Sequence, residues 1–486
     1  MFWRCSSRRS IYRPVLARRI RASITICILA TFSLISRYNY KVNILKRLPA
    51  WGSLALLTYM PFHIFLAQSV SLLTGGLSAW KVGKDVLLIF LTIVSVALVY
   101  ARAKQTKLFN VLFGLTFAYG LVHLIVWALN PDIFRETALL GTLYNWRVAG
   151  FGLLGYGVSL LYPDVVTRRR VIRLVLLVST IVSLIALVQY FLPKDILTHF
   201  GYSLERGVRP AFFIDDKPDL PRVMATMRDP NSLAAYLLLP ILLLAAHLRR
   251  AKQKLLPVGL LVLHGLAMFL TFSRAAVGGL VVAAAAYYVL TWGPRLDFAK
   301  HKKRIALAVV AVLLLGGFGY VFRDQYVVQN IILHSDESTQ AEQDSNDLHV
   351  SLAVDGIKKV LAFPFGHGPG TAGIVSIRNQ DGIMLTENYY IQIGYEVGIW
   401  GLALFLGLCV LIVLSLNRRN DEERVLIAIF VGYSAMAMLM HLWTNEAVAA
   451  QWWLAAGLAA GWNQKHSLTH KTGRLKDNKA KAKARV

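Results

Sequence analysis

The chain is short of cysteine and of charge. Only three cysteines occur in 486 residues, and Cys5, Cys27 and Cys409 lie near the start of the chain or inside apolar stretches. This placement predicts neither a disulfide framework nor a metal-thiolate site. Charged residues make up only 16% of the chain, whereas 56% of its residues are hydrophobic. Soluble domains are much more polar, so the composition indicates an integral membrane protein.

Acidic residues are also scarce beside basic ones. The chain has 26 Asp and Glu against 53 Lys and Arg, which gives a net charge of +27. Such an excess is also found in nucleic-acid-binding proteins, but here the basic residues form short clusters between apolar runs. That pattern is the one expected of cytoplasmic connections in a membrane protein. We therefore expect the lipid bilayer as a partner, and no nucleic acid.

Long apolar runs recur along the chain. Since a spanning helix needs about 20 mostly apolar residues, the sequence predicts an all-α polytopic membrane protein with about twelve spans. These lie near 51–73, 86–101, 108–129, 144–162, 171–192, 231–248, 255–272, 275–292, 305–322, 390–416, 425–443 and 447–462. The shorter run 22–36 has basic residues on both flanks, which favours an interfacial or re-entrant helix, and it is counted apart from the twelve.

The basic connections set the orientation. Those at 102–107, 168–170, 249–254, 300–304 and 418–424 all fall on one face, and the positive-inside rule makes that face cytoplasmic. The sequence thus predicts a multi-pass protein of the cytoplasmic membrane with both termini inside. Its expected parts are a basic N-terminal segment (1–50), a first bundle (51–322) with an outer loop (193–230), a large outer loop (323–389), C-terminal spans (390–462) and a basic cytoplasmic tail (463–486).

The large outer loop is the only long polar segment among these apolar runs. Within it, Val350, Val354, Ile357 and Leu361 recur at helical spacing. We therefore expect an amphipathic helix that begins near residue 346, packs on the bundle through this stripe and ends before Pro364. A structured loop that leads into a span, where water meets lipid-borne substrate, is the first place to look for a site.

Four stretches near the predicted outer face carry recognisable motifs. They are Arg222-Val-Met-Ala-Thr-Met-Arg228-Asp229-Pro230-Asn231-Ser-Leu-Ala-Ala-Tyr236, Thr271-Phe-Ser-Arg274-Ala-Ala, Gly366-His-Gly-Pro-Gly370, and Glu387-Asn-Tyr-Tyr-Ile-Gln…Glu396-Val-Gly-Ile-Trp-Gly401. Their order and spacing around one large outer loop resemble the O-antigen ligase and O-antigen polymerase superfamily. The resemblance implies an all-helical membrane glycosyltransferase. Such an enzyme transfers a glycan from a polyprenyl-diphosphate carrier to a glycan or lipid acceptor hydroxyl, without a metal, cofactor or nucleotide sugar.

Arginines suit the diphosphate of such a carrier, because a guanidinium binds phosphate oxygens bidentately and stays protonated. Arg274 is the first candidate, since it lies between two predicted spans with almost no loop at the outer boundary. The alternative for Arg274 is an arginine that snorkels to lipid headgroups. Arg222 and Arg228 are further candidates, and Asn231 and Asn388, from the same motifs, complete the predicted substrate-binding set.

The acceptor hydroxyl must lose its proton as it attacks, which requires a base. Glu387 is the predicted base, because it lies at the junction of loop and membrane, where partial desolvation raises a carboxyl pKa. Ligases of the resembled family commonly have a histidine near this junction, so a glutamate favours a polymerase. His367, His334 and His349 are rival bases. Glu396, inside a predicted span, is expected to form a structural interhelical hydrogen bond.

These observations predict a membrane enzyme that polymerises lipid-linked glycan repeat units. Ligation of a finished glycan to a lipid or protein acceptor is the first alternative. A transporter or flippase for the same lipid-linked glycan is the second, but it requires a polar path through the bundle, and few charges fall within the predicted spans.

Overall fold

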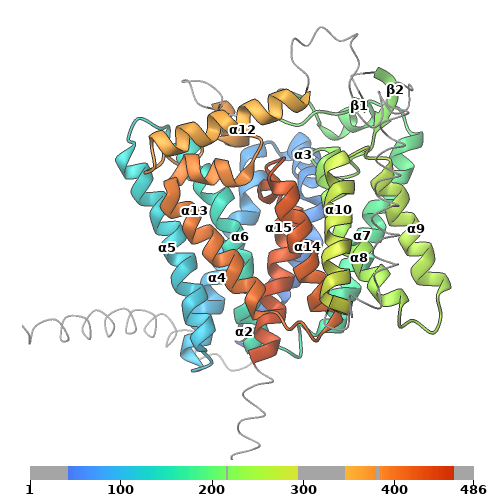
Figure 1. Ribbon diagram of the computed structural model, residues 1–486, viewed down its shortest axis with the longest axis horizontal. Coiled ribbons are helices and arrows are strands. Elements are labelled where there is room, and N and C mark those ends of the chain that lie inside the picture. The colour runs from blue at the N-terminus through green and yellow to red at the C-terminus, as the bar shows by residue number, and fades with distance from the viewer. Residues whose placement is uncertain (1–41, 215–216, 294–344, 379–383, 385, 465–486) are drawn as a thin grey trace, which may run out of the picture.

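The structure is a computed structural model that describes residues 42–214, 217–293, 345–378, 384 and 386–464 (Figure 1). The described chain is mostly helical, as predicted. One departure is a short antiparallel hairpin in the loop 193–230, in which Phe212 pairs with Arg222. Its strands are β1 (Phe212–Ile214) and β2 (Lys217–Arg222).

Helices make up nearly all of the regular structure. In chain order they are α2 (Val42–Tyr59), η1 (Met60–Phe62), α3 (His63–Thr74), α4 (Leu77–Ala101), α5 (Lys107–Leu129), α6 (Arg135–Leu161), α7 (Arg168–Phe191), η2 (Ile196–Phe200), α8 (Pro230–Leu248), α9 (Leu255–Phe269), α10 (Arg274–Trp292), α12 (Ser345–Ala362), η5 (Gly373–Arg378), α13 (Tyr389–Ser415), α14 (Asp421–Ala437), η6 (Leu442–Thr444), α15 (Glu446–Ala449) and η7 (Ala450–Leu454).

Seven helices among the described residues are long and apolar enough to cross a membrane. They cover Arg47–Thr74, Leu77–Ala101, Lys107–Leu129, Arg168–Phe191, Pro230–Leu248, Arg274–Trp292 and Tyr389–Ser415. The predicted count of about twelve is not confirmed. Among the other predicted spans, 255–272 and 425–443 fall on the shorter helices α9 and α14. The predicted span 305–322 and the run 22–36 lie outside the described residues.

The two ends of the bundle differ. The connections after α4, α8 and α13, which carry the basic clusters, lie at one end, and α12 and the β1–β2 hairpin lie at the other (Figure 1). We call the second end the loop end. The basic connections that the structure describes thus share one face, as the sequence predicts. The connection 300–304 lies outside the described residues, and the side of the membrane that this face meets stays a prediction.

The core lies around α6 and the helix that follows α15. Residues 147–161 of α6 are buried throughout, and Trp443, Trp452 and Trp453 are fully buried beside them. The two helices approach closely because glycines meet backbone at the contact. A Cβ on Gly155 would collide with the Leu454 carbonyl oxygen, so no larger residue fits there. This contact brings the start of α15 against α6 at the loop end.

The amphipathic helix of the outer loop exists as α12, but its predicted packing is wrong. The stripe points outward, with Val354, Ile357 and Leu361 exposed by 45%, 49% and 71%. Gly356 and Val360 face the bundle instead, against Ile391 and Gly394 of α13. One contact partner in each pair is glycine, so the two helices approach closely along a narrow line. The wider apolar stripe is left uncovered by the part of the chain that the structure describes.

Candidate active site

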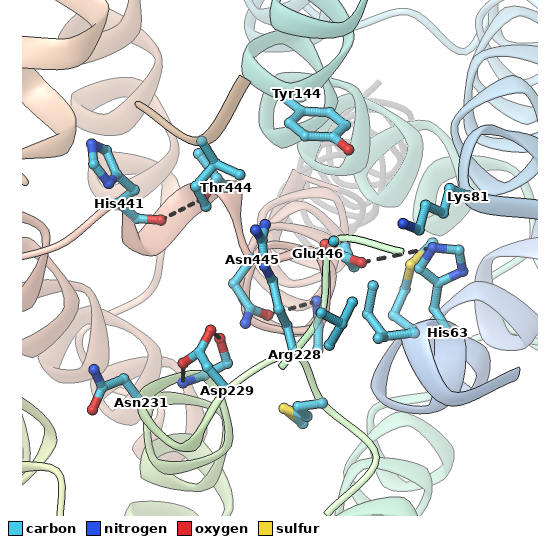
Figure 2. Close-up of a pocket in the computed structure, with 18 of the residues that line it drawn as sticks. His63, Lys81, Tyr144, Arg228, Asp229, Asn231, His441, Thr444, Asn445 and Glu446 are labelled. Carbon is cyan, nitrogen blue, oxygen red and sulfur yellow. Dashed lines mark hydrogen bonds and ion pairs between the residues drawn. The ribbon is translucent and has the colours of Figure 1, made fainter. Parts of the chain in front are cut away.

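A cavity of about 440 Å³ lies at the loop end of the bundle (Figure 2). It is lined by the junction of η1 and α3, the first turns of α4, residue 144 of α6, the segment 226–232, η5 and the segment 439–447. Its polar lining residues are His63, Lys81, Lys84, Tyr144, Thr226, Arg228, Asp229, Asn231, Ser232, Glu387, His441, Thr444, Asn445 and Glu446. Elements from both halves of the chain therefore meet here.

Three of the predicted site residues line this cavity. They are Glu387, Arg228 and Asn231. The Arg228 side chain forms no hydrogen bond or ion pair with any residue that the structure describes, so its guanidinium is available to an anionic ligand. The neighbouring Asp229 is occupied, since its two carboxylate oxygens accept from the Ser232 amide (2.8 Å) and hydroxyl (2.7 Å) and cap α8.

Glu387 is held in an unusual backbone conformation. Its φ is 46°, in the left-handed region that non-glycine residues rarely adopt. The next residue, Asn388, caps α13, and its Oδ1 accepts from the Tyr390 and Ile391 amides at 3.0 Å. The Asn388 amide group also donates to the Met438 carbonyl at 3.1 Å. Asn388 is outside the cavity lining. The cap that it forms holds the backbone of the preceding residue, Glu387, in place.

Arg222 and Arg274 lie outside the cavity lining. Arg222 donates to the Thr271 carbonyl at 2.8 Å and to Asn231 Oδ1 at 2.9 Å. It therefore joins the first two motif stretches and orients Asn231 at the cavity wall. Arg274 is exposed in the first turn of α10, where the Ser273 hydroxyl accepts from the Ala276 amide and caps the helix.

The rival base His367 is also away from the cavity lining. Its ring stacks on Tyr395, with centroids 3.9 Å apart and planes 5° apart. Burial lowers the pKa of His367, the Tyr395 carbonyl opposes this shift, and Lys359 adds to it. The ring thus packs against α13 as a neutral group at pH 7. His334 lies outside the described residues.

The glycine-rich turn fills a break in α13. The helix is interrupted at Val397 and Gly398, where the φ of Gly398 is 71°. The amides of His367 and Gly368 donate to the carbonyls of Tyr395 and Glu396 at 2.8 Å, and the Ile399 amide donates to the Pro364 carbonyl at 3.0 Å. The turn therefore pairs with backbone groups that the break frees.

Glu396 lies beside this break and is fully buried. Its carboxylate accepts from Asn145 of α6 at 2.6 Å, from Gln392 at 3.1 Å and from the Ala372 amide at 3.4 Å. The expected interhelical hydrogen bond is confirmed, and it joins α6, α13 and the glycine-rich turn. The glycine-rich motif thus has a structural role here.

The sequence reasoning missed a buried network of charges that includes His63, Lys84 and Glu446 of the cavity lining. Lys84 Nζ lies 2.9 Å from Asp85 Oδ2, and Arg147 lies 3.9 Å from Asp85 Oδ1 and 3.7 Å from Glu446 Oε2. His63 Nε2 lies 3.7 Å from Glu446 Oε1. The signal that could have found them is Arg147 itself, since an ionisable residue within a predicted span usually has a function or a buried partner.

Arg147 is the centre of this network. Its side chain is only 1% exposed. It donates to the Thr444 carbonyl, and its guanidinium lies 4.5 Å from the centroid of the Tyr144 ring. Burial raises the pKa of Glu446, but Lys84, Arg147 and His63 outweigh that effect and lower it to about 2. Glu446 is therefore ionised at neutral pH, so it can accept hydrogen bonds from sugar hydroxyls but is a weak base.

His441 is a second base candidate that the sequence did not reveal. It was assigned to the predicted span 425–443, but α14 ends at Ala437 and the chain then turns into the cavity wall. Burial and, to a smaller extent, the charge of nearby Arg228 lower the pKa of His441 to about 4. Its Nε2 lies 3.2 Å from the Thr386 hydroxyl, directly before Glu387.

Residues 259–406 match the family model described as O-antigen ligase. This match supports the predicted resemblance to the O-antigen ligase and polymerase superfamily. No match was found among curated proteins. The O-antigen ligase segment includes Arg274, the glycine-rich turn and Glu387, and with the apolar helices it supports an O-antigen ligase- or polymerase-like membrane enzyme. Arg228, Arg147 and Glu446 lie outside that segment, so the cavity combines matched and unmatched parts of the chain.

Proposed function

We propose that this protein is a membrane glycosyltransferase that polymerises glycan repeat units from a polyprenyl-diphosphate carrier at the outer face of the cytoplasmic membrane. Its active site is the cavity at the loop end. The proposal rests on one observation. Glu387, from the O-antigen ligase segment, and Arg228 line the same cavity. A base and a phosphate-binding cation are the two groups that this transfer requires.

The proposed chemistry is a single displacement at the anomeric carbon of the donor sugar. The acceptor hydroxyl oxygen bonds to that carbon as its proton passes to the Glu387 carboxylate. The bond from the anomeric carbon to the diphosphate oxygen breaks, and the electron pair leaves with the carrier diphosphate. Arg228, with Lys81 and Lys84 of α4 in the same cavity lining, stabilises the negative charge that develops on the leaving group.

The remaining predicted residues take supporting roles. Arg222 holds Asn231 at the cavity wall, where its amide and the ionised Glu446 orient sugar hydroxyls. Arg274, exposed at the start of α10, is assigned to the carrier as it approaches from the membrane. The proposed diphosphate clamp therefore consists of two arginines: Arg228 inside the cavity and Arg274 outside it, at the start of α10.

Ligation is the second candidate, and the description of the matched family favours it. Glycan profiles of cells with and without the protein separate the candidates. Loss of long chains with single units retained on the acceptor indicates a polymerase, whereas loss of all transferred glycan indicates a ligase or a flippase. Transfer by the purified protein in liposomes then excludes the flippase.

The base is tested by Glu387→Gln, which keeps the shape of the side chain but cannot accept the proton. We expect transfer from a purified lipid-linked glycan to fall by about 10²- to 10⁴-fold, with donor binding unchanged. Glu136→Gln, at an exposed position of the same bundle end, is the matched control and should retain activity. The opposite outcome is normal turnover in Glu387→Gln together with a His441→Gln variant that still binds the donor but has lost turnover. That outcome would show that His441 is the base.

A further inference from the structure

The outward face of α12 carries an apolar ridge that no described part of the protein covers. The ridge consists of Val354, Ile357, Leu361, Phe363 and Phe365, and the last two are exposed by 45% and 63%. On a soluble surface such a patch usually marks an interaction site. We propose that the α12 ridge is embedded in the interfacial layer of the membrane, so that α12 lies on the bilayer as an amphipathic anchor.

The position of α12 supports a lipid partner. The helix lies across the loop end of the bundle, above α5 and α13 (Figure 1). Both of these helices are candidate spans. Their surfaces near the same end are apolar and exposed, with Leu129 of α5 exposed by 66% and Trp400 of α13 by 63%. Lipid that surrounds α5 and α13 therefore reaches the level of α12.

The ridge is continuous with the lipid-facing surface of α13. The Ile399 amide donates to the Pro364 carbonyl at 3.0 Å, which places Phe363 and Phe365 next to the exposed Ile399 and Trp400. One apolar layer can therefore cover both, and a bilayer is the partner that already covers the exposed side of a spanning helix.

The polar residues of α12 fit this arrangement. Asp355, Lys358 and Lys359 are exposed beside the ridge, and Lys359 forms an ion pair with Asp355 at 2.8 Å. Interfacial helices have an apolar face toward the acyl chains and lysines toward the headgroups. The close contacts of Gly356 and Val360 then attach this anchor to α13, and through it to the break beside Glu396.

The anchor is tested by spin labels in liposomes. Cysteine is introduced singly at Ile357, Leu361 and, as the matched polar control, Lys358, in a chain whose three native cysteines are replaced by serine. Oxygen concentrates in lipid and a nickel chelate stays in water, so the ratio of their collision rates reports the surroundings of each label. We expect oxygen to dominate at Ile357→Cys and Leu361→Cys and the nickel chelate to dominate at Lys358→Cys.

Two results would overturn the proposal. Dominant nickel collisions at Ile357→Cys and Leu361→Cys would place the ridge in water. Low collision rates with both agents at these positions would show that protein covers the ridge, such as a second copy of the chain. All three positions are exposed, so the labels leave the packed face of α12 intact, and an unchanged apparent Tm of each labelled protein verifies this.

Discussion

Replacing Arg147 with methionine tests the buried charge network most directly. Methionine fills a similar volume but removes the cation from between Asp85 and Glu446. Asp85 keeps Lys84 at 2.9 Å, whereas Glu446 loses its ion pair with Arg147 and keeps His63 at 3.7 Å and the more distant charge of Lys84. Removing one partner of a buried ion pair costs about 3–5 kcal/mol, because the other charge stays buried and uncompensated. We expect Arg147→Met to lower the free energy of unfolding by that amount, mainly through Glu446.

The pairing itself is measured by a double-mutant cycle with Glu446→Gln. If the two groups compensate each other, the double variant is less destabilised than the sum of the single variants, by about 0.5–3 kcal/mol. The pKa of Glu446 in the folded protein is about 2, below its ordinary value. Its stabilisation is therefore present above the ordinary carboxyl pKa and is lost as the pH falls toward 2. Measurements at pH 7 thus record the whole effect.

The assay is unfolding in detergent micelles, followed by circular dichroism. Arg135→Met is the control, since Arg135 is an exposed arginine of the same helix. We expect the control to stay within about 0.5 kcal/mol of the wild-type protein. An equally small effect of Arg147→Met, or strict additivity in the double variant, would refute the assignment of Arg147 as the shared partner of the two carboxylates.

Three further predictions follow from the structure. Arg228→Lys should weaken binding of the lipid-linked donor by about tenfold or more, because lysine lacks the planar fork of the guanidinium. Arg274→Lys should weaken donor binding less. Unchanged donor binding in Arg228→Lys would contradict the role of Arg228 in the diphosphate clamp. Gly398→Ala should destabilise the protein by more than about 1 kcal/mol, since φ is 71° and a Cβ meets the Pro364 carbonyl; an unchanged apparent Tm would contradict this. In intact cells, cysteine at Ser203 should react with an impermeant thiol reagent and cysteine at Arg418 should not, and the reverse pattern would invert the predicted topology.

Hydropathy predicted where most described helices lie, but not where they begin and end. The predicted span 86–101 begins in the structure at Leu77, so α4 contains Lys81, Lys84 and Asp85. Lys84 and Asp85 remain in the helix because they pair with each other and Asp85 also lies near Arg147 of α6. A hydropathy profile treats each charge as unpaired. The predicted start of the helix therefore falls after Lys81, Lys84 and Asp85.

The residues of the candidate active site could be predicted from the sequence only where they belong to a recognised motif. Arg228 and Glu387 were selected from motif stretches, and both line the cavity. His63, Arg147 and Glu446 lie on separate elements far apart in the sequence, so their proximity depends on tertiary packing. No local pattern in the chain contains that information. The direction of the α12 ridge was missed for the same reason, because Gly356 and Gly394 decide which face packs.

The position of Glu446 has a consequence for biogenesis. During synthesis, Arg147 of α6 is made long before the ribosome reaches Glu446, and until then Asp85 is its anionic partner within the network. The charge balance is completed only when the final described helix inserts beside α6. A chain arrested before that point has an arginine with only one of its two carboxylate partners. Because Glu446 also lines the cavity, the charge network and the candidate active site are completed in the same assembly step.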